Sequence, residues 1–237
     1  LHDALPISDG RATLVPGPGY RALGAGAEAV ERFRYTLSDG RGGLAEGEVA
    51  VTVAGVNDAP EAADDAVSAG VGQALAGSLL EANGPAGRAD ADPDAGDAVA
   101  VVAVDGRAAA VGTTVATRAG GRVTVEADGR FAYDQAGAFA GLGEGETATD
   151  GFAYTLSDGR GGEDVAEVTI TIDGANLSPV ARDDAGFAVS EDGPAIAGDV
   201  LADNGAGADA DGNGDALAAL ALDGAAAAIG APVRLAS

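Results

Sequence analysis

The feature that most constrains this chain is an internal repeat. Residues 33–60, FRYTLSDGRGGLAEGEVAVTVAGVNDAP, return without a gap as residues 152–179, FAYTLSDGRGGEDVAEVTITIDGANLSP, with 16 of 28 positions identical and an offset of 119. A match of this length within one chain predicts a tandem array of similar structural units. Each copy has the pattern of an alternating strand with both rings on one face, a glycine-rich turn, a second alternating strand and a proline that ends it.

The offset also predicts how the chain is organised. Residues 9–58 align with the C-terminal half of a unit, residues 59–177 form one complete unit, and residues 178–237 begin a further one. Residues 1–8 do not continue this order and hold the single His of the chain, so we interpret them as a non-repeat leader from a sequencing or assembly junction. We therefore expect one complete and two partial units, in a piece of a longer protein.

Composition and spacing predict an all-β fold. Aromatic residues make up 4% of the chain and there is no Trp or Met, so the core must consist of Val, Ala, Leu and Ile around a few rings, with Phe152 and Tyr154 facing inward. Short strands with turn signals between them favour tandem antiparallel β-sandwich units of the immunoglobulin or cadherin kind. The expected strands of the complete unit are residues 98–104, 122–127, 130–133, 151–156 and 165–172. The Ala-rich residues 225–228 are interpreted as loop or weak strand.

The charge of the chain excludes several classes of partner and chemistry. The net charge is −25, which repels nucleic acid and anionic membrane surfaces, and no apolar run is long enough to span a bilayer. Without Cys, and with the one His set aside, neither a Ser-His-Asp triad nor a His/Cys zinc site can be built. The residue types present do not exclude a carboxylate pair of the glycosidase type. However, the acidic positions recur with the repeat, which favours several equivalent sites over one active site. We expect no enzyme here.

The best chemical signal is an acidic loop. Asp209, Asp211 and Asn213 stand at alternate positions before Gly214, and Asp215 follows them. Alternate oxygen-bearing side chains on a glycine turn are typical of the first half of a calcium loop. The open alternative is a solvated acidic loop without a metal.

The corresponding loop of the complete unit is more acidic. It carries Asp90, Asp92 and Asp94, and Asp97 follows. The twelfth position of an EF-hand, a Glu, is occupied by Val101 here and by Leu220 in the later loop, so further ligands would have to come from elsewhere. The linker and the Asp pairs after it are the nearest sources. The predicted metal ligands are therefore Asn57, Asp58, Asp64, Asp65, Asp90, Asp92, Asp94, Asp97, Asp183, Asp184, Asp209, Asp211, Asn213 and Asp215.

Two other acidic motifs allow alternatives. The pairs Asp64-Asp65 and Asp183-Asp184 place like charges side by side, which favours a bound cation unless the two side chains point to opposite faces of a strand. Asp39 and Asp158 begin the glycine-rich turns, and we interpret them mainly as caps that accept backbone N–H groups, with a calcium role as the lesser alternative.

The order of these motifs resembles the cadherin-like and immunoglobulin-like tandem repeats of large bacterial surface proteins, the VCBS type included. The resemblance covers residues 9–237 and rests on a combination of motifs: Val56-Asn57-Asp58-Ala59-Pro60, Asp64-Asp65, Asp90-Ala91-Asp92-Pro93-Asp94, Phe131-Ala132-Tyr133 and residues 152–159. It implies a β-sandwich module of an extracellular or surface-attached stalk or adhesin, often calcium-dependent. One departure stands out, because the Asn57-Asp58 of the first linker becomes Asn176-Leu177 in the second, which makes equal metal binding doubtful.

The sequence thus predicts an extender segment of a secreted or cell-surface bacterial protein of the adhesin kind, in which calcium stiffens the joints and the partners are neighbouring repeats of the same chain. The alternative is a binding module for a carbohydrate or protein ligand, accessory to an extracellular enzyme. Glycan binding usually needs exposed aromatic rings, and the chain has only five Phe and four Tyr, most of them at strand positions.

Overall fold

A computed structural model describes residues 10–11, 13–83, 88–188, 190, 192–194, 196–203, 205 and 207–220. The predicted leader, residues 1–8, and the Ala-rich residues 225–228 lie outside the described residues. Within them the regular structure is almost entirely β, and the helical content consists of two 3-10 turns, η1 (Pro18–Tyr20) and η2 (Ala108–Ala110). The predicted all-β class is confirmed.

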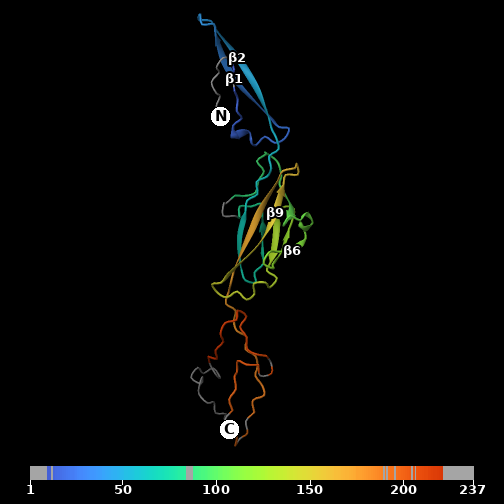
Figure 1. Ribbon diagram of the computed structural model, residues 1–237, viewed down its shortest axis with the longest axis vertical. Helices are drawn as coiled ribbons and strands as arrows, with labels where there is room; N and C mark the ends of the chain where they lie inside the picture. Colours follow the sequence, from blue (N-terminus) through green and yellow to red (C-terminus); the bar gives the residue numbers. More distant parts are fainter. Residues whose placement is uncertain are drawn as a thin grey trace. The chain divides into compact units, whose positions relative to one another are not determined.

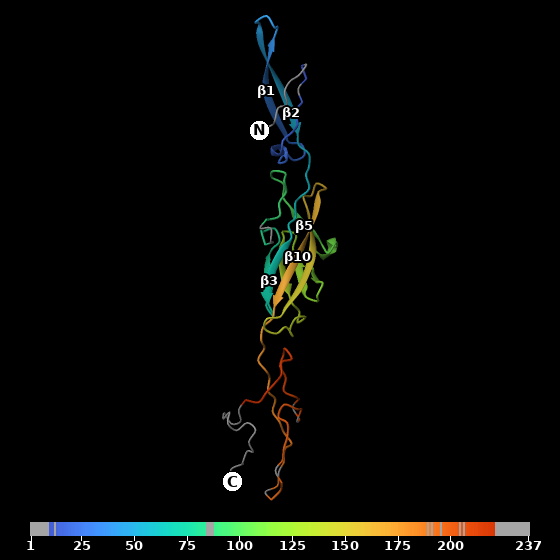
Figure 2. The ribbon, with the colours of Figure 1, turned by 60° about the vertical axis from the view of Figure 1, so that its left-hand side comes forward.

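Ten strands are present in the described residues. They are β1 (Glu28–Ser38), β2 (Leu44–Ala54), β3 (Asp65–Gly70), β4 (Leu75–Ser78), β5 (Ala100–Val104), β6 (Thr114–Ala116), β7 (Arg122–Val125), β8 (Arg130–Asp134), β9 (Thr147–Ser157) and β10 (Glu163–Asp173). They form a two-stranded sheet, β1-β2, and two four-stranded sheets with the orders β3-β10-β9-β5 and β4-β8-β7-β6. Figure 1 shows the β1-β2 hairpin in blue, and Figure 2 shows β3, β10 and β5 of the first four-stranded sheet.

The two four-stranded sheets pack as a β-sandwich. Alternate residues of β8 and β9 are buried, as expected for strands with one face on a core. The ring of Phe131 in one sheet lies 6.4 Å from the ring of Phe152 in the other, tilted by 58°. Phe152 and Tyr154 are both 0% exposed, so the prediction that they face the core is confirmed.

The strands found from the sequence are those with strong alternation. The five expected ranges correspond to β5, β7, β8, β9 and β10. β3, β4 and β6 were missed. The sequences of β3 and β4, DAVSAG and LAGS, are rich in Ala, Gly and Ser, which have little intrinsic preference for strands, and β6, TVA, is only three residues long. Pairing with neighbouring strands decides their conformation.

The two glycine-rich turns have the same construction. Asp158 Oδ1 accepts hydrogen bonds from the backbone N–H groups of Arg160 (2.7 Å) and Gly162 (3.0 Å), and Asp39 Oδ1 accepts the corresponding two bonds at 2.7 and 2.9 Å. Gly159 and Gly161 have φ of 71° and 106°, a region that side chains disfavour. The predicted role of both Asp residues as turn caps is confirmed.

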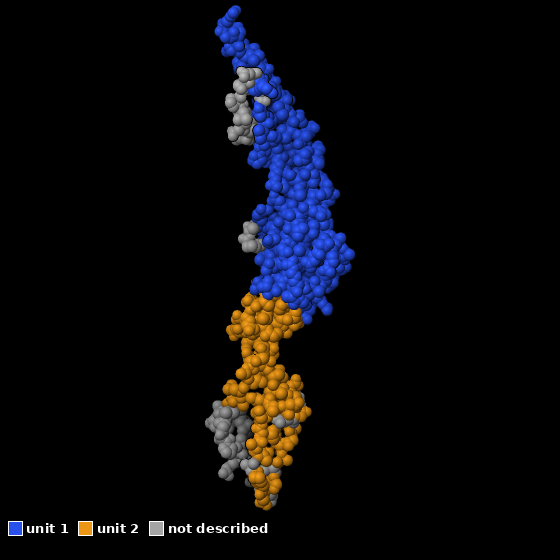
Figure 3. All heavy atoms as spheres, viewed as in Figure 1, with its two compact units in different colours: residues 1–67, 74–136, 149–171 blue, residues 68–73, 137–148, 172–237 orange. Residues whose placement is uncertain are grey.

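The chain divides into two compact units by its contacts. Unit 1 comprises residues 1–67, 74–136 and 149–171, and unit 2 comprises residues 68–73, 137–148 and 172–237 (Figure 3). Among the described residues of unit 2 after Gly174, the only regular pairing is an isolated antiparallel bridge between Val180 and Ala210. No helix in the described residues has the length and hydrophobicity needed to cross a membrane.

Candidate metal centre

The acidic loop of unit 1 is folded by its own side chains. The backbone N–H of Asp94 donates to Asp92 Oδ1 at 2.8 Å, and the N–H of Asp97 donates to the carbonyl of Asp94 at 3.2 Å. Gly96 supplies a φ of 92° between them. These local bonds turn the loop back on itself, so that carboxylates separated by two or three residues converge.

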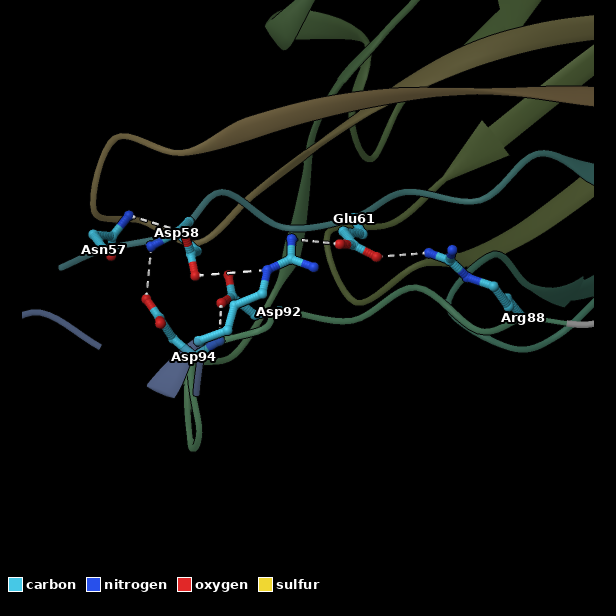
Figure 4. A network of polar contacts seen from close by, with 7 residues as sticks. Asn57, Asp58, Glu61, Arg88, Asp92 and Asp94 are labelled. Atoms are coloured by element: carbon cyan, nitrogen blue, oxygen red, sulfur yellow. Dashed lines mark hydrogen bonds and ion pairs between the residues drawn. The ribbon is translucent and has the colours of Figure 1, made fainter. Parts of the chain in front are cut away.

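The linker meets this loop directly. The backbone N–H of Asp58 donates to Asp94 Oδ2 at 2.9 Å, and Figure 4 shows Asn57, Asp58, Asp92 and Asp94 gathered around this contact. Asn57 is oriented by its amide, which donates to Asp158 Oδ2 at 2.7 Å and to the carbonyl of Asp58 at 3.0 Å. The side-chain oxygen of Asn57 is thereby left free for another partner.

The site is short of hydrogen-bond donors. One carboxylate oxygen from each of Asp92, Asp94 and Asp97 lies within 4.8 Å of the others. Asn57 Oδ1, Asp92 Oδ2, Asp94 Oδ1 and Asp97 Oδ2 are all buried and accept no hydrogen bond. Asp94 as a whole is only 2% exposed. Buried oxygens without a partner are costly, and hard cations such as Ca²⁺ take ligands of this kind, so the donor set fits an oxygen-coordinated divalent ion.

Two arginines compensate the charge in part. Arg160 Nη1 lies 2.8 Å from Asp97 Oδ2 as an ion pair, although its orientation does not make a hydrogen bond to that oxygen. Arg21 Nε lies 3.9 Å from Asp58 Oδ2, while its Nη2 donates to Glu61 at 2.6 Å. The ion pairs of these two arginines go to Asp58, Glu61 and Asp97, and neither pairs with Asp92 or Asp94.

Asp65 and Asp90, also predicted as metal ligands, form a different group. Asp90 Oδ2 accepts from the hydroxyl of Tyr154 at 2.7 Å and its Oδ1 accepts from the N–H of Ala63 at 2.7 Å, while Asp65 Oδ2 lies 3.4 Å from the same hydroxyl. Burial, together with the charge of Asp90, raises the pKa of Asp65 to about 7, and burial also raises the pKa of Asp90. Asp65 and Asp90 are therefore a buried acid pair grouped around the Tyr154 hydroxyl inside the sandwich.

The Asp pairs do not converge on one point. Asp64 is exposed and accepts from the N–H of Glu167 at 2.9 Å, while Asp65 is 4% exposed. The structure therefore corresponds to the alternative in which the two side chains point to opposite faces. In unit 2, Asp183 is exposed and Asp184 is half-buried.

In the acidic loop of unit 2, the side chains of Asp209 and Asp211 accept hydrogen bonds from backbone N–H groups. Asp209 Oδ1 accepts from the N–H of Arg182 at 2.6 Å, and Asp211 Oδ1 accepts from the N–H groups of Asn213 (2.8 Å) and Asp215 (3.4 Å). Asp215 is exposed. Among the described residues of unit 2, no three carboxylates come together as Asp92, Asp94 and Asp97 do in unit 1.

Two acidic residues that matter were not among the predicted ligands. Asp158 supports the site, because it accepts the hydrogen bond that orients the Asn57 side chain. That hydrogen bond is the largest cause that lowers the pKa of Asp158, followed by the hydrogen bonds from the backbone N–H groups of the turn. Asp150 is 3% exposed; burial alone would raise its pKa, but bonds from Thr117, Ala119 and other donors outweigh this and lower it. The repeat marked Asp158 through its turn, whereas nothing in the sequence marked Asp150.

The two packed sheets define an all-β sandwich module with a group of buried oxygens at one end of the linker. Residues 57–174 match the family model described as the bacterial cadherin-like domain, and over these residues the chain is a bacterial cadherin-like domain. Cadherin-like domains are typically extracellular modules of adhesion proteins that typically bind calcium and are generally not enzymes.

Solved structures similar to the chain include two sets of protocadherin domains. Protocadherin Gamma B2 extracellular cadherin domains 3–6 match with 14% identity and a TM-score of 0.35, covering 76% of this chain and 41% of that one. Domains 1–5 of the same protein match with 14% identity and a TM-score of 0.33, covering 73% and 31%. The chain thus spans less than half of either structure. No curated protein sequence matches the chain.

Proposed function

We propose that this chain is a non-catalytic extender segment of a large secreted or cell-surface bacterial protein of the adhesin kind, and that calcium stiffens it at the first joint. The first joint is the contact of residues 21–24, 55–58 and 90–97, all within unit 1. The observation that carries the proposal is the set of four buried side-chain oxygens that accept no hydrogen bond, of which only Asp97 Oδ2 has an ion-pair partner. The proposed ligands are Asn57, Asp58, Asp92, Asp94 and Asp97.

The chemistry of the donor set favours calcium over magnesium. All the donors are carboxylate or amide oxygens, and they come from a linker and a loop that are separated by more than thirty residues of chain. Calcium accepts six to eight oxygens in flexible geometry, whereas magnesium demands near-octahedral geometry and releases water reluctantly. An ion at this place would join the linker to the loop and offset part of the net charge of −25.

The expected affinity is that of an extracellular module. Such sites bind calcium with a dissociation constant of about 10⁻⁴–10⁻³ M. At roughly 100 times that constant, binding would stabilise the folded state by about 2.7 kcal/mol. The joint would be half-saturated at about 0.1–1 mM calcium, a level found outside cells rather than in the cytosol.

Isothermal titration calorimetry of the full chain with calcium, with magnesium as the comparison ion at matched ionic strength, tests the proposal. We expect saturable binding of calcium that Asp94→Asn abolishes. Glu126→Gln is the matched control, because it removes one negative charge from an exposed position and should bind like the parent chain. Equal responses to both ions, or binding that survives Asp94→Asn, would leave only a general acidic surface.

A further inference from the structure

The second joint, made by residues 140–143, 174–177 and 209–216 of unit 2, repeats the first at an offset of 119. From it we infer that the second joint closes without a metal ion, because the side-chain amide of Asn213 takes the part that a cation has in the first joint. The inference rests on the proposed calcium site of the first joint. The sequence pattern predicted Asn213 as a metal ligand. The inference instead assigns it the role of a hydrogen-bond donor that replaces the metal.

The two joints share one backbone scaffold. The bridge Glu61↔Ala91 recurs as Val180↔Ala210, and the bond from the N–H of Ala63 to Asp90 (2.7 Å) recurs from Arg182 to Asp209 (2.6 Å). In both joints the N–H of a glycine donates at 2.8 Å to the carbonyl of a loop residue, from Gly55 to Ala27 and from Gly174 to Glu146. A difference between the joints therefore arises from side chains and not from another path of the chain.

Asp94 and Asn213 occupy equivalent positions in this scaffold and make the same first contact. Asp94 Oδ2 accepts from the N–H of Asp58 at 2.9 Å, and Asn213 Oδ1 accepts from the N–H of Leu177 at 2.6 Å. The side chains also lean on the same neighbouring loop, since a Cβ added to Gly24 would lie 3.3 Å from the Asp94 side chain and one added to Gly143 would lie 4.0 Å from Asn213 Cβ. The two side chains therefore occupy corresponding places, with Asp94 buried and Asn213 half-buried.

The second terminal atoms, Asp94 Oδ1 and Asn213 Nδ2, differ in their hydrogen bonding. Asp94 Oδ1 is buried and has no partner. Asn213 Nδ2 donates to the carbonyl of Leu142 at 3.0 Å and to that of Ala175 at 3.3 Å. An amide N–H₂ group is a two-donor group, and it binds backbone carbonyls where a carboxylate would repel them. The amide of Asn213 thus provides hydrogen-bond donors within the chain, and the first joint has no such donors at this position.

Two other carboxylates of the first joint are also replaced. Leu177 stands at the position of Asp58 and Ala216 at the position of Asp97. The Leu177 side chain lies against the acidic loop, because a Cβ added to Gly212 would come within 2.6 Å of its Cδ1. Three carboxylates of the first joint thus have no carboxylate counterpart in the second. Of those that remain, Asp209 and Asp211 already accept backbone N–H groups, and Asp215 is exposed.

The consequence is a chain with two kinds of joint. The first joint stiffens when calcium is present, while the second has the same order at any calcium level. Loss of calcium would then loosen the segment at one defined place, and the residues at the positions of Asp58, Asp94 and Asp97 would decide which joints of a repeat array respond.

Hydrogen exchange of the full chain, with millimolar calcium or with a chelator, separates the two joints. In the first joint we expect the N–H groups of Asp58, Glu61 and Ala63 to gain protection with calcium. In the second joint we expect the N–H groups of Leu177 and Arg182 to be protected equally under both conditions. Protection of these second-joint amides by calcium would overturn the inference, whereas absence of any calcium effect at Asp58 and Ala63 would overturn the proposed calcium site instead.

Exchanging the two side chains sharpens the test. Asn213→Asp should lower protection of the Leu177 N–H by about tenfold in chelator, since two hydrogen bonds are lost. Asp94→Asn should make protection of the Asp58 N–H independent of calcium. The control Asp215→Asn changes an exposed carboxylate of the same loop and should leave both joints as they are. Unchanged protection of Leu177 in Asn213→Asp would show that the amide does not hold the joint.

Discussion

The hairpins β1-β2 and β9-β10 share their sequence pattern but not their surroundings. Phe33 is half-buried and Leu37 is 60% exposed, whereas the equivalent Phe152 and Leu156 are both 0% exposed. In the described residues β1 and β2 pair only with each other, while β9 and β10 are the central strands of a sheet covered by a second sheet. The same residues thus form the same strands and turn in both places, and the covering elements decide how much each side chain contributes to stability.

Removing the inward-facing Phe ring of each hairpin should give the largest difference in stability between the two hairpins. Phe152→Ala removes a fully buried ring that packs against Phe131, and we expect it to lower the free energy of unfolding by about 3–5 kcal/mol. Phe33→Ala should cost about 1 kcal/mol or less, because half-buried side chains leave little cavity. Denaturant unfolding of the full chain, followed by circular dichroism, measures both. Equal costs would mean that the inner face of β1-β2 is covered as well as that of β9-β10.

The buried acids beside Tyr154 should make stability fall as pH rises. The unfolded carboxyl of Asp65 releases its proton near pH 4, but the folded one keeps it until about pH 7, so the folded state loses stability between these values and does not regain it above them. Asp65→Asn should remove this slope and raise the free energy of unfolding at pH 8 by about 3 kcal/mol.

The measurement is denaturant unfolding of parent and variant across this pH range, without calcium. Tyr35, the counterpart of Tyr154, lies over Gly47 and belongs to the uncovered hairpin, so Tyr35→Phe is a suitable control with no change in the pH slope. Parallel curves for the parent chain and Asp65→Asn would contradict the assignment of the slope to this acid.

Asp150, the first buried residue of β9, should contribute more to stability than its counterpart Glu31 in β1. Asp150 accepts bonds from the Tyr133 hydroxyl at 2.8 Å, from the N–H of Ala119 at 2.8 Å, and from the Thr117 hydroxyl. Hydrogen bonds to a buried charge are worth more than neutral ones, so Asp150→Asn should cost about 2 kcal/mol and Glu31→Gln less than about 0.5 kcal/mol. Thermal melts at neutral pH compare the two variants, and a small effect of Asp150→Asn would show that an amide serves these donors equally well.

The smallest difference in stability is expected at the turns, where the hairpins are alike. Asp39→Ala and Asp158→Ala each remove two bonds to backbone N–H groups and should cost about 1 kcal/mol. Only Asp158→Ala should also weaken calcium binding, because Asp158 orients Asn57 toward the site. Calorimetric titration of both variants gives this comparison, and equal affinities would remove Asp158 from the support of the site.

Local structure and the repeat could be predicted from the sequence, because both depend on residues close together in the chain. Alternation of apolar residues specified β9 and β10, and Ser-Asp-Gly-Arg-Gly-Gly specified a capped turn, since these arrangements are decided within a few residues. The acidic loop was found in the same way, as a short run of oxygen-bearing side chains. The short strands β3, β4 and β6 were not, since their pairing partners lie far away in sequence.

Which acids belong together was decided only by the tertiary structure. Of the acidic residues near the first linker, Asp92, Asp94 and Asp97 converge on one another, while Asp65 and Asp90 turn inward to Tyr154 and Asp64 turns outward. The bonds that make this division join residues 36 to 103 positions apart. Spacing along the chain reports which side chains are neighbours within a loop, but burial and the supply of donors depend on what packs against that loop, and these two conditions separate a metal site from a buried acid pair.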